Sequence, residues 1–174
     1  MLSRIRLIAT DVDGVLTDGT FWFSTSGDEM KRFCFRDVTG IALAKSSGLI
    51  MALISGESSP AGKALVQRYA EKMKIEDVYK GCQDKSVAVR ELASKYGLSL
   101  GEICFIGDDF NDVSAMALVG LSVAPADAHD SARKAATLIT KQSGGQGVVR
   151  EVIDMVMRSR AESEEVLPLE ADLG

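Results

Sequence analysis

The sequence predicts an α/β protein built on a doubly wound, mostly parallel β-sheet. Four apolar runs have the length of strands and contain almost no polar residues, which is typical of parallel strands buried on both faces. These runs are residues 5–10 (IRLIAT), 49–54 (LIMALI), 103–106 (ICFI) and 121–124 (LSVA). Helical periodicity lies between and after them, with apolar residues at i, i+3, i+4 and i+7 from Val89 and from Val149. Strands that alternate with helices favour one sheet between two helical layers, joined by right-handed crossovers.

A segment after the first run has a different pattern. Residues 20–33 place aromatic strand formers on both sides of a Ser-Gly-Asp turn at 26–28, which predicts an inserted β-hairpin over about residues 20–35. Phe21 and Phe23 would share one face of this hairpin, because side chains two positions apart on a strand point the same way. A two-stranded ribbon is marginally stable alone, so we expect the hairpin to pack against a neighbour.

Length and charge limit the possible classes of protein. The chain has 174 residues without a repeat or linker, and we expect a single domain over residues 1–160. A net charge of -5 argues against nucleic acid or an anionic membrane as a partner. The acidic tail, residues 161–174, is expected to be flexible or docked on a neighbouring subunit.

Cysteine and histidine usage adds two expectations. Cys34, Cys82 and Cys104 have no paired spacing, which indicates packed, reduced thiols and a cytoplasmic protein. We find no signal-peptide pattern and no apolar run near the ~20 residues that a membrane span needs. His129 is the only histidine, which leaves little material for multi-histidine metal sites or Ser-His-Asp catalysis.

Two carboxylates follow the first run. Asp11 and Asp13 are two positions apart in extended chain, so their side chains point to the same side, and Gly14 lets the backbone turn sharply afterwards. Adjacent carboxylates are costly unless a cation neutralises them. Ligands of open α/β sheets bind beyond the carboxyl ends of the strands, which is where this pair would lie. The alternative is a turn with solvated aspartates.

Two weaker signals come next along the chain. Ser55 and Gly56 end the second run, where a hydroxyl and a free backbone N–H can hold a phosphoryl oxygen. Lys85 begins a predicted helix, where its charge opposes the helix dipole, and this favours a functional role. A helix N-cap for the serine and a solvated surface for the lysine are the alternatives.

An oxygen-rich cluster follows the third run. Its side chains are carboxylates and one amide at a strand end, which suits Mg²⁺. The members are Asp108, Asp109, Asn111 and Asp112. Asp109 and Asp112 could instead cap the next helix.

Together these motifs resemble the haloacid dehalogenase superfamily of phosphohydrolases over nearly the whole chain. The specific signals are DVDGVLTDG and GDDFNDVSAM. Ser55 and Lys85 are specific only when they occur together with these two motifs. The resemblance implies a Rossmann-like fold. Residues 14–54 and 56–84 are too few to hold the separate cap domain that many members carry.

The hairpin, the sequence FRD at 35–37 and GGQGVVRE at 144–151 look like the cap-less 3-deoxy-D-manno-octulosonate 8-phosphate phosphatase group. That group also includes phosphatases of nine-carbon ulosonate 9-phosphates. The resemblance implies a small phosphorylated sugar acid as substrate and a homotetramer in which hairpins meet and a neighbour helps to cover each active site. It also implies that Arg36 and Asp37 bind the substrate.

The resemblance implies a role for each site residue. Asp11 would attack phosphorus, and Asp13 would protonate the leaving oxygen and later accept a proton from water. Asp11, the Asp13 carbonyl and Asp108 would hold Mg²⁺. Ser55, Gly56 and Lys85 would bind the phosphoryl oxygens. The residues that bind the metal and the phosphoryl group would be held in position by Asp109, Asn111 and Asp112.

Two departures from the group affect the expected substrate. Val38 replaces a usual glycine after Arg36-Asp37. Glu57 stands where members specific for the eight-carbon substrate usually carry arginine, which would suit a sugar carboxylate. Glu57, paired with Lys72 of the following helix, would favour a nine-carbon 2-keto-3-deoxy-ulosonate 9-phosphate. An acid in the first turn of a helix is the alternative for Glu57.

Three other functions stay open at this point. One is 3-deoxy-D-manno-octulosonate 8-phosphate phosphatase activity in lipopolysaccharide precursor synthesis. The second is a catalytically silent assembly domain of the same fold. The third is a phosphoacceptor switch of receiver type, although a DxD on the first strand argues against it.

Overall fold

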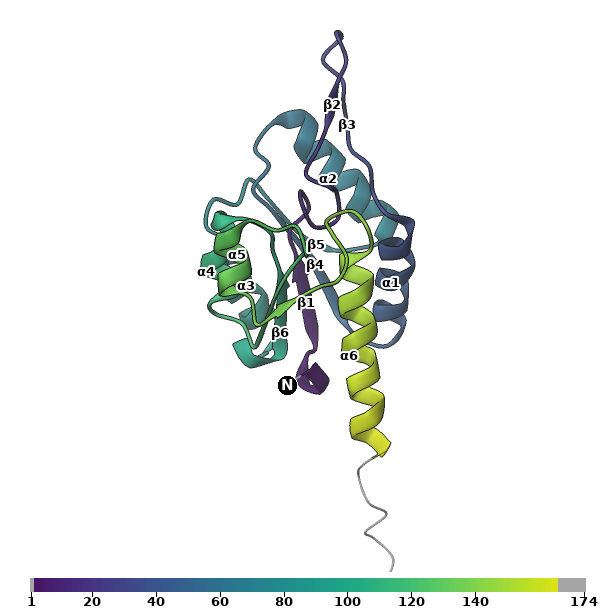
Figure 1. The fold of residues 1–174 in the computed structure, drawn as a ribbon, viewed down its shortest axis with the longest axis vertical. Helices are drawn as coiled ribbons and strands as arrows, with labels where there is room; N and C mark the ends of the chain where they lie inside the picture. Colours follow the sequence, from purple (N-terminus) through teal and green to yellow (C-terminus); the bar gives the residue numbers. More distant parts are fainter. Residues whose placement is uncertain (1, 166–174) are drawn as a thin grey trace, which may run out of the picture.

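The computed structural model describes residues 2–165 and contains a six-stranded parallel sheet (Figure 1). Its strand order is β5-β4-β1-β6-β7-β8. The strands are β1 (Leu7–Thr10), β4 (Ile50–Ser55), β5 (Asp77–Lys80), β6 (Ile103–Ile106), β7 (Leu121–Ala124) and β8 (Leu138–Ile139). Every residue of β1, β6 and β7 is buried, and the predicted doubly wound α/β fold is confirmed.

Helices cover both faces of the sheet. Figure 1 shows α1 and α6 on one side and α3, α4 and α5 on the other. The helices are α1 (Phe35–Ser46), α2 (Pro60–Met73), α3 (Lys85–Tyr96), α4 (Val113–Met116), α5 (Asp130–Ala135) and α6 (Val148–Glu165), with short 3₁₀ turns η1 (Leu2–Arg4), η2 (Leu100–Glu102) and η3 (Phe110–Asp112). Neighbouring residues of β1 point into the hydrophobic cores on opposite faces of the sheet. Ile8 packs with α1, α2 and α6, whereas Leu7 and Ala9 pack with α3 to α5.

The chain order creates a crevice at β1. From β1 the chain builds β4 and β5 on one side and then returns to add β6, β7 and β8 on the other. Such a reversal places the carboxyl ends of β1, β4 and β6 around one opening, which is the usual ligand site of an open α/β sheet.

The predicted hairpin is present as a separate antiparallel pair, β2 (Trp22–Phe23) with β3 (Glu29–Met30). The shared face is also confirmed, because the rings of Phe21 and Phe23 meet edge to face with centroids 4.8 Å apart. Gly27 turns the chain with φ +89°, a conformation that glycine adopts without strain. Figure 1 shows the hairpin projecting past the carboxyl ends of the strands.

Helix α6 continues past the predicted boundary at residue 160, through Glu165. Residues 161–165 of the expected flexible or docked tail are therefore helical, and residues 166–174 lie outside the described residues. Among the helices of residues 2–165, none combines the length and the apolar character needed to cross a membrane.

Candidate active site

The predicted catalytic side chains meet at the crevice. Asp11 follows β1, Ser55 ends β4 and Asp108 follows β6 by two residues. Asp11 and Asp108 border a cavity of about 300 Å³, and Ser55 is buried next to Gly56 of its lining. Its lining residues are Asp11, Asp13, Gly19, Gly56, Glu57, Asp108, Asp109 and Asn111. The structure thus brings together residues from three strand ends that are far apart in the sequence.

Asp11 is held in one orientation. Its Oδ1 accepts a hydrogen bond of 2.7 Å from the Val12 amide, and its Oδ2 lies 2.7 Å from Lys85 Nζ. Burial raises the pKa of Asp11 to about 7, although Lys85 opposes this shift. Gly14 has φ +84°, and a Cβ there would overlap the Asp108 carboxylate. A side chain at position 14 would therefore disturb both the turn and the acidic pocket.

Lys85 lies fully buried between two carboxylates. Its Nζ is 2.7 Å from Asp11 Oδ2 and 2.6 Å from Asp112 Oδ1. Burial alone would lower the pKa of Lys85, but the two aspartates raise it above its ordinary value. The lysine therefore stays charged at the start of α3, where the helix dipole alone would disfavour it.

Asp112 uses both of its oxygens within the protein. While Oδ1 meets Lys85, Oδ2 accepts hydrogen bonds from the backbone amides of Asp108 at 2.8 Å and Asp109 at 3.2 Å. Asp109 in turn caps η3, so both aspartates have the capping role given above as an alternative. Asp112 also orients Lys85, so capping and support of the site coincide in one side chain.

The remaining oxygens fit Mg²⁺. Asp11, Asp108 and Asp112 each offer an oxygen within 4.8 Å of the others, and Asp112 is already engaged as described. Burial, followed by repulsion from Asp11, raises the pKa of Asp108 to about 8. A buried and a half-buried carboxylate at this separation need a cation to remain ionised, and carboxylate oxygen is the donor that Mg²⁺ prefers. Asp11 and Asp108 would hold the metal together with the Asp13 carbonyl.

Gly56 and Glu57 line the crevice on the β4 side, directly after Ser55. Ser55 is buried, and its Oγ accepts a hydrogen bond of 3.1 Å from the Glu57 amide, which leaves its own proton free to donate. Glu57 Oε1 accepts 2.8 Å from the Ser59 amide, and Ser59 is the N-cap of α2. Glu57 therefore precedes α2, and the alternative of an acid in its first turn is wrong.

The expected pairing of Glu57 with Lys72 is also wrong. Glu57 Oε2 lies 3.4 Å from Nζ of Lys31, which follows strand β3. Lys72 is exposed in the last turn of α2, beside Lys45 and Lys74. Helix α2 begins at Pro60, so Lys72 lies about three turns from the helix start, whereas Glu57 precedes that start.

Sequence reasoning missed Lys31 altogether. Its Nζ lies 2.9 Å from Asp13 Oδ1 and 3.0 Å from Asp13 Oδ2, and only 4% of its side chain is exposed. The return of the chain after β3 brings it to Asp13, 18 residues earlier in the sequence.

Arg36 and Asp37 lie elsewhere within one chain. Asp37 is buried, and its Oδ1 accepts a hydrogen bond of 2.8 Å from the Arg150 amide in the first turn of α6. Burial raises the pKa of Asp37 to about 6. Arg36 lines a separate cavity beside Gly147 and Arg150. Neither Arg36 nor Asp37 lines the acidic crevice of its own chain, and the Asp37 side chain joins α1 to α6.

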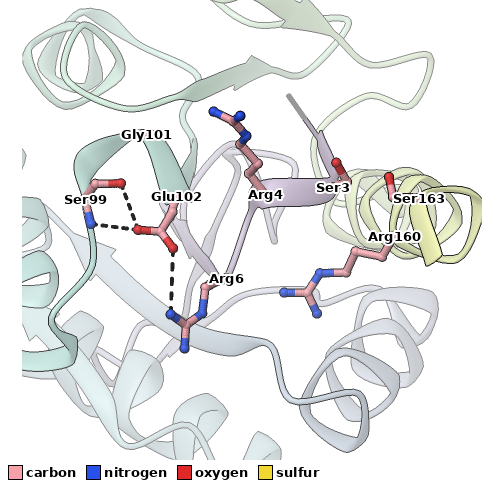
Figure 2. Close-up of a pocket in the computed structure, with 8 residues that line it drawn as sticks. All are labelled: Ser3, Arg4, Arg6, Ser99, Gly101, Glu102, Arg160 and Ser163. Carbon is pink, nitrogen blue, oxygen red and sulfur yellow. Dashed lines mark hydrogen bonds and ion pairs between the residues drawn. The ribbon is translucent and has the colours of Figure 1, made fainter. Parts of the chain in front are cut away.

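A cavity of about 710 Å³ lies at the opposite end of the sheet (Figure 2). Arg4 and Arg6 precede β1 there, and Arg160 comes from α6. Arg6 pairs with Glu102 at 3.7 Å, while Arg160 donates 2.7 Å to the Ile5 carbonyl. Figure 2 shows Arg4 pointing away from Arg6, so the three cations do not converge on one point. The acidic crevice is smaller, but it is the cavity that contains the carboxylates of Asp11, Asp13 and Asp108.

Comparison with known proteins agrees with this geometry. Residues 41–152 match the family model of haloacid dehalogenase-like hydrolases. The 3-deoxy-D-manno-octulosonate 8-phosphate phosphatase KdsC of Escherichia coli K12 is 37% identical over 162 residues, which cover 93% of this chain and 84% of that protein. The corresponding phosphatase of Yersinia pestis has a crystal structure that superposes with a TM-score of 0.87 at 37% identity, covering 94% of this chain and 86% of that one.

A third relative adds ligands. The phosphatase of Moraxella catarrhalis, solved with a magnesium ion, a phosphate ion and a KDO molecule, is 34% identical with a TM-score of 0.87, covering 94% of this chain and 92% of that one. The acidic crevice, its fit to Mg²⁺ and these relatives exclude a receiver-type switch and a silent assembly domain. The chain belongs to the haloacid dehalogenase-like hydrolases, within the KdsC-type 3-deoxy-D-manno-octulosonate 8-phosphate phosphatase group, and is a magnesium-dependent phosphoric monoester hydrolase.

Proposed function

We propose that this chain hydrolyses 3-deoxy-D-manno-octulosonate 8-phosphate to the free sugar acid and inorganic phosphate in the cytoplasm. The observation that carries the proposal is the buried Lys85, held by Asp11 and Asp112 beside Asp108, in a chain with 37% identity to phosphatases of that substrate. The sugar acid bound in the Moraxella catarrhalis phosphatase gives further support.

In the proposed first step, Asp11 Oδ attacks phosphorus and the bond to the sugar oxygen breaks. Asp13 gives its proton to the departing oxygen, so that the sugar leaves as an alcohol. Lys85 and the Ser55 hydroxyl hold the phosphoryl oxygens, over which negative charge spreads in the transition state. Mg²⁺, when bound, supplies positive charge that lets an anionic substrate approach the two aspartates.

In the second step, water attacks the phosphorus of the aspartyl phosphate. Asp13, now a carboxylate, accepts the proton of that water, and Asp11 is released as a carboxylate. Asp112 acts through Lys85 and the loop amides, because it holds both in place throughout. Asp13 is the more exposed of the two catalytic carboxylates, with 36% of its side chain accessible, which suits a group that must reach first the leaving oxygen and then water.

The eight-carbon substrate replaces the nine-carbon preference inferred from Glu57. That inference assumed a carboxylate free to face the sugar or to pair with Lys72. Glu57 is instead occupied by the Ser59 amide and Lys31, and it is about four-fifths buried, with 20% of its side chain exposed. Because this carboxylate is already bonded within the protein, we do not expect it to exclude the eight-carbon substrate, which the relatives named above hydrolyse.

The test is a comparison of kcat/KM for the eight-carbon 8-phosphate and a nine-carbon ulosonate 9-phosphate at saturating Mg²⁺. We expect the eight-carbon substrate to be preferred by at least ~10-fold, which corresponds to ~1.4 kcal/mol of differential transition-state binding. Equal values, or a preference for the nine-carbon substrate, would overturn this assignment. Glu57→Gln is the informative variant, because it keeps the shape of the side chain and removes its charge.

We also propose a homotetramer assembled through the hairpin. Phe21, Trp22, Phe23 and Met30 are each more than half exposed, which is a large apolar surface for a two-stranded ribbon. Burying these side chains against neighbouring copies would remove that surface from water. It would also bring a second chain near the crevice, where that chain would help to cover the substrate.

A further inference from the structure

The ammonium of Lys31 sits among three carboxylates. Besides its two contacts with Asp13, its Nζ lies 3.3 Å from Glu29 Oε1 and 3.4 Å from Glu57 Oε2. The side chains of Lys31 and Glu29 are 4% and 7% exposed, whereas those of Glu57 and Asp13 are 20% and 36% exposed. The three carboxylates repel one another, and Lys31 is a cation that contacts all of them.

The contact with Asp13 has a distinctive geometry. One ammonium lies within 3.0 Å of both carboxylate oxygens of Asp13, which fixes the direction of the side chain. Lys85 contacts the other aspartate through one oxygen, at 2.7 Å from Asp11 Oδ2. Each of the two aspartates of the DxD motif therefore has its own lysine, one from α3 and one from the hairpin.

The origin of Lys31 links the hairpin to the site. The residue follows β3 directly, so its position depends on how the hairpin is placed over the crevice. Glu29, on β3 itself, joins the same cluster and reinforces the connection. A shift of the hairpin would withdraw the ammonium and leave Asp13 without this restraint.

We infer that Lys31 is a positioning residue for Asp13, and that through it the placement of the hairpin governs proton transfer to the leaving group. This inference rests on the proposed function, in which Asp13 is the acid. A positioning role predicts a loss that depends on the leaving group. A sugar alkoxide needs a proton to depart, whereas para-nitrophenolate leaves without one.

The experiment measures kcat/KM of Lys31→Met for 3-deoxy-D-manno-octulosonate 8-phosphate and for para-nitrophenyl phosphate, with Mg²⁺. This constant covers the steps up to departure of the leaving group. We expect a loss of ~10–100-fold for the sugar phosphate, as for a misplaced acid, and a value near wild type for para-nitrophenyl phosphate. Lys31→Arg, which keeps the charge, should recover most of the sugar phosphate activity.

Two controls make the result specific. Arg32→Met removes the neighbouring hairpin cation, which pairs with Asp18 at 3.2 Å, and should leave both activities unchanged. In an Asp13→Asn background, Lys31→Met should cost nothing further, because a residue that acts through Asp13 has no effect once the acid is gone. Para-nitrophenyl phosphate turnover itself reports whether Asp11, Lys85 and Asp108 are still assembled. If Lys31→Met does not fold, Lys31→Gln takes its place.

Equal losses for both substrates, or additive losses in the double variant, would overturn the role of Lys31. The proposed function is tested separately by Asp13→Asn alone. If that variant showed no dependence on the leaving group, the assignment of Asp13 as acid would fail. If Asp13→Asn showed it and Lys31→Met did not, only the inference about Lys31 would fail.

Discussion

Asp112→Asn tests how the buried charge at the centre of the site is balanced. The wild-type side chain is fully buried and meets Lys85 Nζ at 2.6 Å, while its other oxygen accepts two backbone amides. Asparagine keeps the shape of the residue. If its oxygen serves the amides, its NH₂ group faces the lysine, donor against donor. Lys85 then has Asp11 as its remaining carboxylate partner.

The magnitude follows from the burial. Removing one partner of a buried ion pair costs about 3–5 kcal/mol, and we expect ~3 kcal/mol here because Asp11 still contacts Lys85. For a domain of this size, that free energy corresponds to a fall of roughly 6–12 °C in melting temperature. Activity should fall by at least ~100-fold, since Lys85 loses its second carboxylate partner and faces a donor in its place.

The assay is urea unfolding of wild type and Asp112→Asn, with turnover measured on the same preparations. Asp109→Asn is the matched control, because its side chain is 49% exposed and caps only a short 3₁₀ turn. We expect it to cost less than ~1 kcal/mol. A similar small cost for Asp112→Asn, with activity retained, would refute the view that Asp112 balances Lys85.

Three further predictions concern metal, assembly and pH. Chelation should abolish activity, Mg²⁺ should restore it, and Ca²⁺ should inhibit because its looser coordination misplaces the phosphoryl group; activity after exhaustive chelation would contradict the metal site. Phe21→Asp with Phe23→Asp should lower the oligomer order by light scattering and the activity together, and a fully active monomer would count against the tetramer. For Asp37, burial raises the pKa from 3.8 to about 6, so the folded state binds the proton more tightly and this contribution to stability is lost as pH rises from about 4 to about 6. Relative to Asp37→Asn, the unfolding free energy of wild type should therefore fall by on the order of 2 kcal/mol over that range, and a constant difference would refute the shift.

Much of the sheet could be predicted because its strands are buried on both faces. Each of the four apolar runs became a strand, with ICFI and LSVA matching β6 and β7 in full. Strands β5 and β8 escaped prediction, since β5 has a charged residue at each end and β8 has two residues. Such short or polar edges carry too little periodic signal to distinguish them from loops.

The site residues also fall into two groups, those that local sequence predicts and those that depend on the fold. Asp11, Asp13 and the cluster from Asp108 to Asp112 follow strand ends, so local sequence was enough to expect them in one crevice. Lys31 and Asp37 depend on partners brought close by the fold, Asp13 at a separation of 18 residues and Arg150 at 113. Neither contact has a sequence pattern. Lys72 was misjudged because the start of α2 decides which end of the helix faces the crevice.

The most direct measurement of the central claim is trapping of the phosphorylated enzyme. Wild type would be mixed with substrate and Mg²⁺, quenched in acid within milliseconds and digested for mass spectrometry. The account predicts that the peptide containing Asp11 gains the mass of one phosphoryl group, that the modification maps to Asp11, and that Asp11→Asn shows neither the adduct nor turnover. Phosphate on another residue, or full turnover by a contaminant-free Asp11→Asn preparation, would contradict it.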